Sequence, residues 1–146
     1  MRSMPATVRS ALLVSIAAAF ACADAHDDVM EVVTSMAGAL TDVNVPKFMS
    51  AFSKDMPDYG TIENNVTALV KQADVSSSVQ TVSEAGDDQA RTIDLDWVLE
   101  VRSLEQDGPV VRRREVIHCQ LRKEKKHWKI VSLKPLDFFA AAKLGH

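Results

Sequence analysis

Residues 91–102, RTIDLDWVLEVR, decide the fold of this chain. Apolar side chains stand at every second position from Ile93 to Val101, and mostly polar ones lie between them. A period of two places one set of side chains on each face of a β-strand, so this segment predicts a strand with one buried face. The segments 75–84, 110–123 and 127–133 are typical of further strands, with turn-forming residues between them. We therefore expect an antiparallel sheet of about four strands.

Helices precede these strands. From Asp28, apolar residues recur three and four positions apart, and Asp28 with Glu31 has the spacing of a capping box. Asn44 is a suitable cap for a second, shorter helix that carries Phe48 and Phe52 on one face, and a third helix is expected over residues 61–73. A short terminal helix should start near Asp137. Amphipathic helices before a hairpin-rich region predict an α+β fold, with the helices packed on a strongly curved sheet.

The first 25 residues have the order of a secretory signal peptide. Arg2 and Arg9 are followed by an uncharged run over residues 10–21, and small residues precede Ala23 and Ala25 at the spacing of a cleavage site. The run is too short to span a bilayer, which takes about 20 apolar residues. We therefore expect residues 1–25 to be a signal peptide and the protein to be periplasmic or extracellular, without a transmembrane segment. Lipidation of Cys22 remains the alternative.

Residues 26–146 have the size of one domain. Of the 17 basic and 20 acidic residues of the chain, 15 and 19 remain after removal of residues 1–25, a net charge of −4. This balance gives no electrostatic basis for binding nucleic acid. Cys119 lies in an apolar row and is expected in the core. The spacing of Cys and His residues predicts no metal site, and no motif indicates a cofactor.

The element order, with Asp96-Trp97 in mid-strand, WKIV at 128–131 and PLDFF at 135–139, resembles the nuclear transport factor 2-like superfamily. The likeness is greatest to its exported, mostly uncharacterised bacterial branch. It implies a cone-shaped, cystatin-like fold with an apolar pocket at the open end. SnoaL-like cyclases, ketosteroid isomerase-like enzymes, dehydratases and many non-catalytic domains share this fold. The family usually has a short strand between its second and third helices, and none is evident over residues 56–60.

Asp96 and His118 are the candidate catalytic pair. If Trp97 lies opposite Ile117 in the next strand, Asp96 lies opposite His118 on the second face of the sheet. A histidine beside a carboxylate is suited to general acid–base chemistry. A solvated ion pair on the outer face is the favoured reading, because the apolar row of Trp97 should face the helices. Tyr59 is a weaker candidate, since a residue at the entrance to a helix more often packs there.

The resemblance also suggests pocket-lining residues. They are Trp97, Leu95, Ile117, Phe48, Phe52 and Arg113. Arg113 shares a row with Ile117, and it either faces the mouth of the cone or lies extended at the end of the sheet.

Two classes of function follow. The favoured one is a non-catalytic exported module whose cone binds a small apolar ligand or is filled by its own side chains. The alternative is a small-molecule isomerase, cyclase or dehydratase that uses Asp96 with His118, or Arg113 with a carboxylate. Val98 and Val116 on the second face also suggest a homodimer through the sheet.

Overall fold

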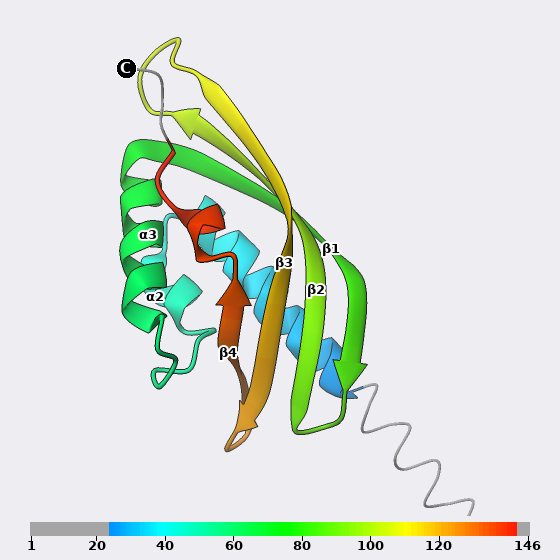
Figure 1. Cartoon of the computed structure of the whole chain (residues 1–146). Coiled ribbons are helices and arrows are strands. Elements are labelled where there is room, and N and C mark those ends of the chain that lie inside the picture. Colours follow the sequence, from blue (N-terminus) through cyan, green and yellow to red (C-terminus); the bar gives the residue numbers. More distant parts are fainter. Residues whose placement is uncertain (1–23, 143–146) are drawn as a thin grey trace, which may run out of the picture.

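The computed structural model describes residues 24–142. It is an α+β fold in which helices pack on a curved antiparallel sheet (Figure 1). A helix covers residues 24–41 and is followed by α2 (Val45–Met49) and α3 (Tyr59–Gln72). The strands are β1 (Ala73–Gly86), β2 (Ala90–Ser103), β3 (Val110–Glu124) and β4 (His127–Lys134), and the 3₁₀ helix η1 (Leu136–Phe139) follows them.

The four strands pair in sequence order, and every pairing is antiparallel. Irregularities between Thr81 and Ser83 and between Gln120 and Leu121 interrupt the ladders, and such bulges bend a sheet. At the β1–β2 turn Gly86 has φ +132°, and a Cβ there would lie 2.3 Å from the carbonyl oxygen of Ala90. Only glycine fits this close approach.

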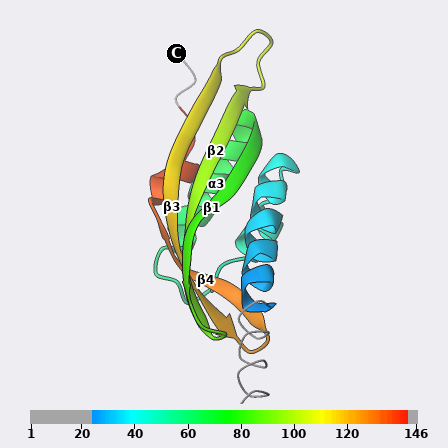
Figure 2. The same ribbon diagram turned by 90° about the vertical axis from the view of Figure 1, so that its right-hand side faces the viewer.

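One face of the sheet forms the core. In β2 the odd-numbered residues from Ile93 to Val101 are buried, and their even-numbered neighbours are more exposed. The helix over residues 24–41 runs alongside this inner face (Figure 2) and buries Val29, Val33, Met36 and Leu40 against the core. The alternation in residues 91–102 thus correctly predicts both the strand and its buried side.

The helix boundaries differ from the predictions in three places. The second helix, α2, ends at Met49, so Phe52 lies beyond it and not on its face. Residues 24–27 are already helical, so Asp28 and Glu31 are exposed positions within the helix rather than a capping box at its start. The third helix begins at Tyr59, two residues before the expected start. Asn44 does cap α2, where its Oδ1 accepts the backbone N–H of Lys47 at 3.1 Å.

Between α2 and α3 the described chain makes one isolated β-bridge and no strand. Phe52 pairs in parallel with Ile130 of β4. The backbone N–H of Ser53 donates to the carbonyl of Ile130, and that of Ile130 donates to the carbonyl of Ala51. The chain therefore pairs with β4 at residues 51–53, ahead of residues 56–60.

No helix within residues 24–142 is long and apolar enough to cross a membrane.

Candidate functional site

Aromatic side chains fill the interior of the cone. Trp97 and Phe48 are fully buried, and Phe139 of η1 lies between them, with ring centroids 5.1 Å from Trp97 and 5.5 Å from Phe48. The indole N–H of Trp97 donates to the hydroxyl of Ser77 at 3.2 Å. Leu95 and Ile117 are also fully buried in this cluster. All five predicted apolar pocket residues contribute to a packed core, and Phe52 also borders a surface hollow.

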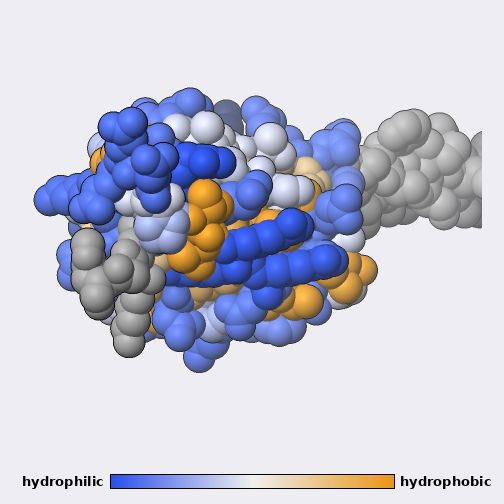
Figure 3. All heavy atoms as spheres, turned by 90° about the horizontal axis from the view of Figure 1, so that it is seen from above, coloured by the Kyte–Doolittle hydropathy of each residue, from blue (hydrophilic) through white to orange (hydrophobic). Residues whose placement is uncertain are grey.

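Arg113 holds the C-terminal segment against the sheet. Its guanidinium donates to the carbonyl oxygens of Phe138 and Ala140, both at 2.7 Å. Partial burial lowers the pKa of this guanidinium, and the nearby carboxylates of Asp137 and Glu115 oppose that change. The side chain therefore binds the chain's own backbone where the sequence suggested a ligand. On the face seen from above in Figure 3, hydrophobic side chains show only as separate patches among hydrophilic ones.

The predicted register of β2 and β3 was wrong by two residues. Asp94 lies opposite His118, and Asp96 lies opposite Val116. A shift of two leaves every side chain on its face, so the apolar pattern could not reveal the error. It does change the partners: His118 Nδ1 is 2.6 Å from Asp94, while Arg114 donates to both oxygens of Asp96, at 3.1 and 2.8 Å. Asp96 and His118 are thus not partners.

These pairs lie on the outer face of the sheet. The hydrogen bonds from His118 and Ser83 lower the pKa of Asp94, and the hydrogen bond from Arg114 lowers that of Asp96. A carboxylate with a lowered pKa is a weaker proton acceptor. The arrangement is therefore that of cross-strand ion pairs exposed to solvent.

Tyr59 lies on the helical side of the sheet, away from those pairs. It is partly buried and packs against the core, and it borders a hollow of about 590 Å³ together with Phe52, Glu63 and Glu124. The structure does not bring Tyr59 together with Asp96 or His118.

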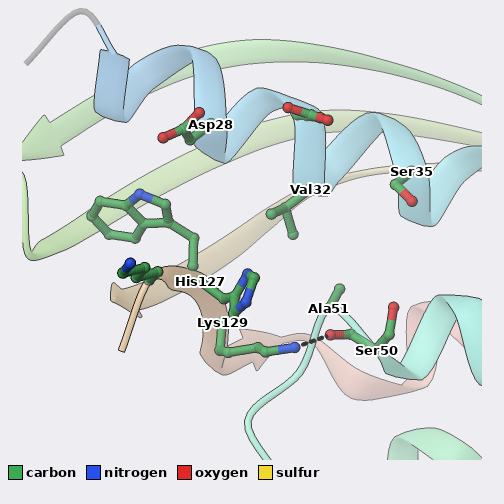
Figure 4. A pocket seen from close by; sticks show the side chains of 10 residues that line it. Asp28, Val32, Ser35, Ser50, Ala51, His127 and Lys129 are labelled. Carbon is green, nitrogen blue, oxygen red and sulfur yellow. Dashed lines mark hydrogen bonds between the residues drawn. The ribbon is translucent and has the colours of Figure 1, made fainter. Parts of the chain in front are cut away.

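A crevice between the helix over residues 24–41 and the β3–β4 hairpin was missed by the sequence analysis. Its volume is about 350 Å³. Asp28, Val32 and Ser35 project from the helix toward His127 and Lys129 of the hairpin (Figure 4). The remaining lining residues are Glu31, Ser50, Ala51, Lys126 and Trp128. The only signal for it in the sequence is Trp128 beside the charged stretch 122–127, a composition that is equally typical of a solvent-exposed turn.

The two walls of this crevice carry opposite charges. Asp28 and Glu31 lie on the helix wall, and Lys126 and His127 lie on the hairpin wall. None of the four forms an ion pair with another residue of the described chain. Lys129 is engaged, since its ammonium donates to the carbonyl of Ser50 at 2.6 Å (Figure 4).

Trp128 is among the residues that line the crevice. The residue is 5% exposed, and its indole N–H is buried without a hydrogen-bond partner in the described part of the chain. Burying such a donor unpaired costs about 1–3 kcal/mol, so native structures usually supply an acceptor.

Within residues 24–142, no group of three His, Cys, Asp or Glu side chains could hold a metal ion.

Solved structures supply the family comparison. The chain superimposes on a scytalone dehydratase candidate from Novosphingobium aromaticivorans DSM 12444 with TM-score 0.65 and 8% identity, covering 74% of this chain and 80% of the other. A LinA type 3 hexachlorocyclohexane dehydrochlorinase from Novosphingobium barchaimii LL02 gives TM-score 0.63 and 9% identity, with 78% and 86% covered. A nuclear transport factor 2-like protein of unknown function from Shewanella oneidensis MR-1 gives 0.55 and 9%, with 74% and 95% covered.

The chain has the nuclear transport factor 2-like fold. No protein family model and no curated protein matches it by sequence. At identities this low the likeness establishes the fold alone, because enzymes and proteins of unknown function share it.

Proposed function

We propose that this nuclear transport factor 2-like domain is a non-catalytic binding module whose ligand lies in the crevice between the N-terminal helix and the β3–β4 hairpin. The observation that carries the proposal is the contrast between two regions. The interior of the cone is occupied by Phe139 between Trp97 and Phe48. The crevice, however, is hollow, and Asp28, Glu31 and Lys126, which line it, form no ion pair within residues 24–142. A concave site with a few converging polar groups is suited to binding a small molecule.

The alternative is an isomerase, cyclase or dehydratase in the interior. Two of the similar structures are described as a dehydratase and a dehydrochlorinase, which keeps this class open. Against it, Asp96 is bound by Arg114 and His118 by Asp94 on the outer face, and Arg113 binds backbone carbonyls. Catalysis needs such groups within reach of a bound substrate. The packing therefore favours binding without catalysis.

Indole resonances of the ¹⁵N-labelled protein test the binding site. The small-molecule fraction of an extract of the protein's own host should move the Trp128 N–H signal and leave that of Trp97, which is bonded to Ser77, in place. Ser35→Trp should fill the crevice and abolish the shift, whereas Thr34→Trp, at the adjacent exposed position, should retain it. An unmoved Trp128 signal, or a shift that survives Ser35→Trp, contradicts the proposed site.

We also propose that the protein is exported, to the periplasm or the outside of the cell. The predicted signal segment lies outside the described residues except for its end, where Ala25 is buried in the core and His26 Nδ1 is 2.6 Å from Glu84. Cleavage after Ala23 preserves both contacts, whereas cleavage after Ala25 removes the first. The intact mass of the secreted protein should correspond to a chain that starts at Asp24. A start at His26, or a lipid on Cys22, would contradict this processing.

A homodimer through the outer face of the sheet is the proposed assembly. Carboxylates on β2 lie beside basic side chains on β3, as in the pairs Asp94–His118 and Asp96–Arg114. When two such faces meet about a twofold axis that runs parallel to the strands between β2 and β3, the acidic strip of one copy lies over the basic strip of the other. Val116, 42% exposed on the same face, supplies an apolar contact.

A further inference from the structure

We propose that the outer edge of β1 binds an extended segment of another polypeptide, which adds to the sheet as a further strand antiparallel to β1. This site is separate from the crevice, so the inference goes beyond the proposed binding of a small molecule. It rests on the backbone groups that the edge leaves unbonded, on the helix that runs alongside it, and on the charges at its two ends.

The two edges of the sheet differ. The edge of β4 is covered by the segment before α3, where the backbone of Ile130 is hydrogen-bonded to Ala51 and Ser53. β1 pairs with β2 alone, and within residues 24–142 no strand or bridge lies on its other side (Figure 2). Edge strands are commonly protected by charged residues, by proline or by a covering segment. Residues 75–81 of β1 contain no charged residue and no proline.

Alternation along the ladder identifies the backbone groups of β1 that point outward. The N–H of Ser103 donates to Pro109 on the β3 side, so the even-numbered residues of β2 direct their backbone groups toward β1. Their partners in β1 are also even-numbered up to the bulge, which leaves the N–H and C=O groups of Val75, Ser77 and Val79 directed away from β2. Within the described chain, no other backbone group is hydrogen-bonded to them. Another extended backbone is the partner that matches such a row of groups.

The helix over residues 24–41 gives this edge a second wall. It runs along the inner side of β1 in the opposite direction, because His26 Nδ1 is 2.6 Å from Glu84 and the hydroxyl of Thr81 donates to the sulfur of Met30 at 3.3 Å. Met30 and Ala37, two turns apart on this flank, are only partly buried. Directly opposite residues of an antiparallel pair share a face, so alternate side chains of an added strand would point toward this helix. Those side chains should therefore be apolar.

Charge argues against a second β1 strand as the occupant. β1 contains Asp74 and Glu84 but no lysine or arginine. Glu84 is paired with His26 and Arg91, whereas Asp74 is exposed and forms no ion pair within residues 24–142. A second copy would bring further carboxylates to this edge and no cation. The complementary segment is uncharged along the middle of the edge and carries a lysine or arginine opposite Asp74.

A synthetic peptide of this pattern tests the site. In antiparallel pairing, acetyl-TVTVTVK-amide places its lysine opposite Asp74 and its valines opposite the three residues with outward backbone groups. We expect saturable binding to a ¹⁵N-labelled chain that starts at Asp24, and slower deuterium exchange of those three amides. The amides of Ser76 and Ser78 already point toward β2 and should not change.

Methylation of the peptide nitrogens distinguishes strand addition from other modes of binding. The valine N–H groups of the peptide face β1 in this pairing, and the threonine N–H groups face away from it. Methylating the valine nitrogens should weaken binding at least about tenfold, whereas methylating the threonine nitrogens should leave it unchanged. Equal losses for the two methylated peptides, or no saturable binding of the parent peptide, would overturn the proposal.

Variants of the protein locate the edge. Val79→Pro removes one outward N–H without removing a hydrogen bond to β2, so it should abolish binding, while Val79→Thr should retain it. Asp74→Lys should favour acetyl-TVTVTVE-amide over the lysine peptide, and Asp88→Lys, at an exposed position in the β1–β2 turn, should keep the original preference. An unchanged preference in Asp74→Lys contradicts the assigned register. Protection of the outward amides that rises with protein concentration alone would identify a second copy as the occupant and overturn the proposal.

Discussion

At the scale of single residues, Cys119 shows how burial sets reactivity. Its side chain lies on the inner face of β3 and the residue is 2% exposed. Desolvation, together with the negative charge of Asp94, raises the pKa of the thiol from 9.0 to about 12. Because the thiolate is the reactive form, the folded protein presents an inert cysteine.

In a chain that starts at Asp24, we expect Cys119 to resist alkylation by iodoacetamide at pH 8 and to react fully in denaturant, as followed by intact mass. The thiol binds its proton more tightly when folded, so its contribution to stability is complete below pH 9 and is lost as the pH rises toward 12. Stoichiometric labelling of the folded protein within minutes would place Cys119 outside the core.

At the scale of elements, the C-terminal segment closes the fold by inserting into it. Phe138 and Phe139 of η1 are buried, and the segment is fixed by side chains from two other elements. Arg113 of β3 binds the carbonyls of Phe138 and Ala140, while Asn65 and Gln72 of α3 donate to the carbonyls of Leu136 and Ala142 at 3.4 and 2.8 Å. The packing of the interior therefore depends on contacts made after the last strand.

Replacing Arg113 by leucine should lower the free energy of unfolding by about 1–2 kcal/mol, because two charge-assisted hydrogen bonds are lost from a half-buried guanidinium. Urea denaturation measures the change. Arg112→Leu is the matched control: its side chain is exposed on the opposite face, so it should change stability by no more than about 0.5 kcal/mol. Equal effects of the two variants would mean that the bonds to the C-terminal segment contribute nothing.

At the scale of the whole molecule, the two faces of the sheet have different roles. The inner face is covered by the helices and by η1, whereas the outer face carries ion pairs and the exposed Val116. The proposed dimer would bury this outer face.

Light scattering at high micromolar concentration should give the mass of a dimer for an unaltered chain that starts at Asp24. Val116→Lys should give a monomer, because it adds a charge at the centre of the proposed contact. Val43→Lys changes a comparably exposed valine in the loop after the N-terminal helix and should leave the dimer intact. A monomeric unaltered protein excludes assembly through the sheet at these concentrations.

The sequence by itself determined the elements and their faces. Alternation in residues 91–102 predicted the strand and its buried side, and helical spacing predicted the buried stripe from Val29 to Leu40, because both periodicities are local properties of the backbone. The alternation of buried and exposed residues along β3 likewise predicted the burial of Cys119. Phe48 and Phe52 do lie together, with ring centroids 5.5 Å apart, but Phe52 lies beyond the end of α2 and not on one face of that helix as predicted.

Only the tertiary structure decided which side chains and segments contact one another. A register shift of two residues preserves every face, so nothing in the pattern could show that Asp96 pairs with Arg114 rather than His118. Nor does local sequence show where the terminal helix packs, and only the folded chain places Phe139 beside Trp97 in the position expected for a ligand. The crevice depends likewise on segments far apart in the chain, since the helix around Asp28 and the hairpin around Trp128 form it only when the sheet brings them together.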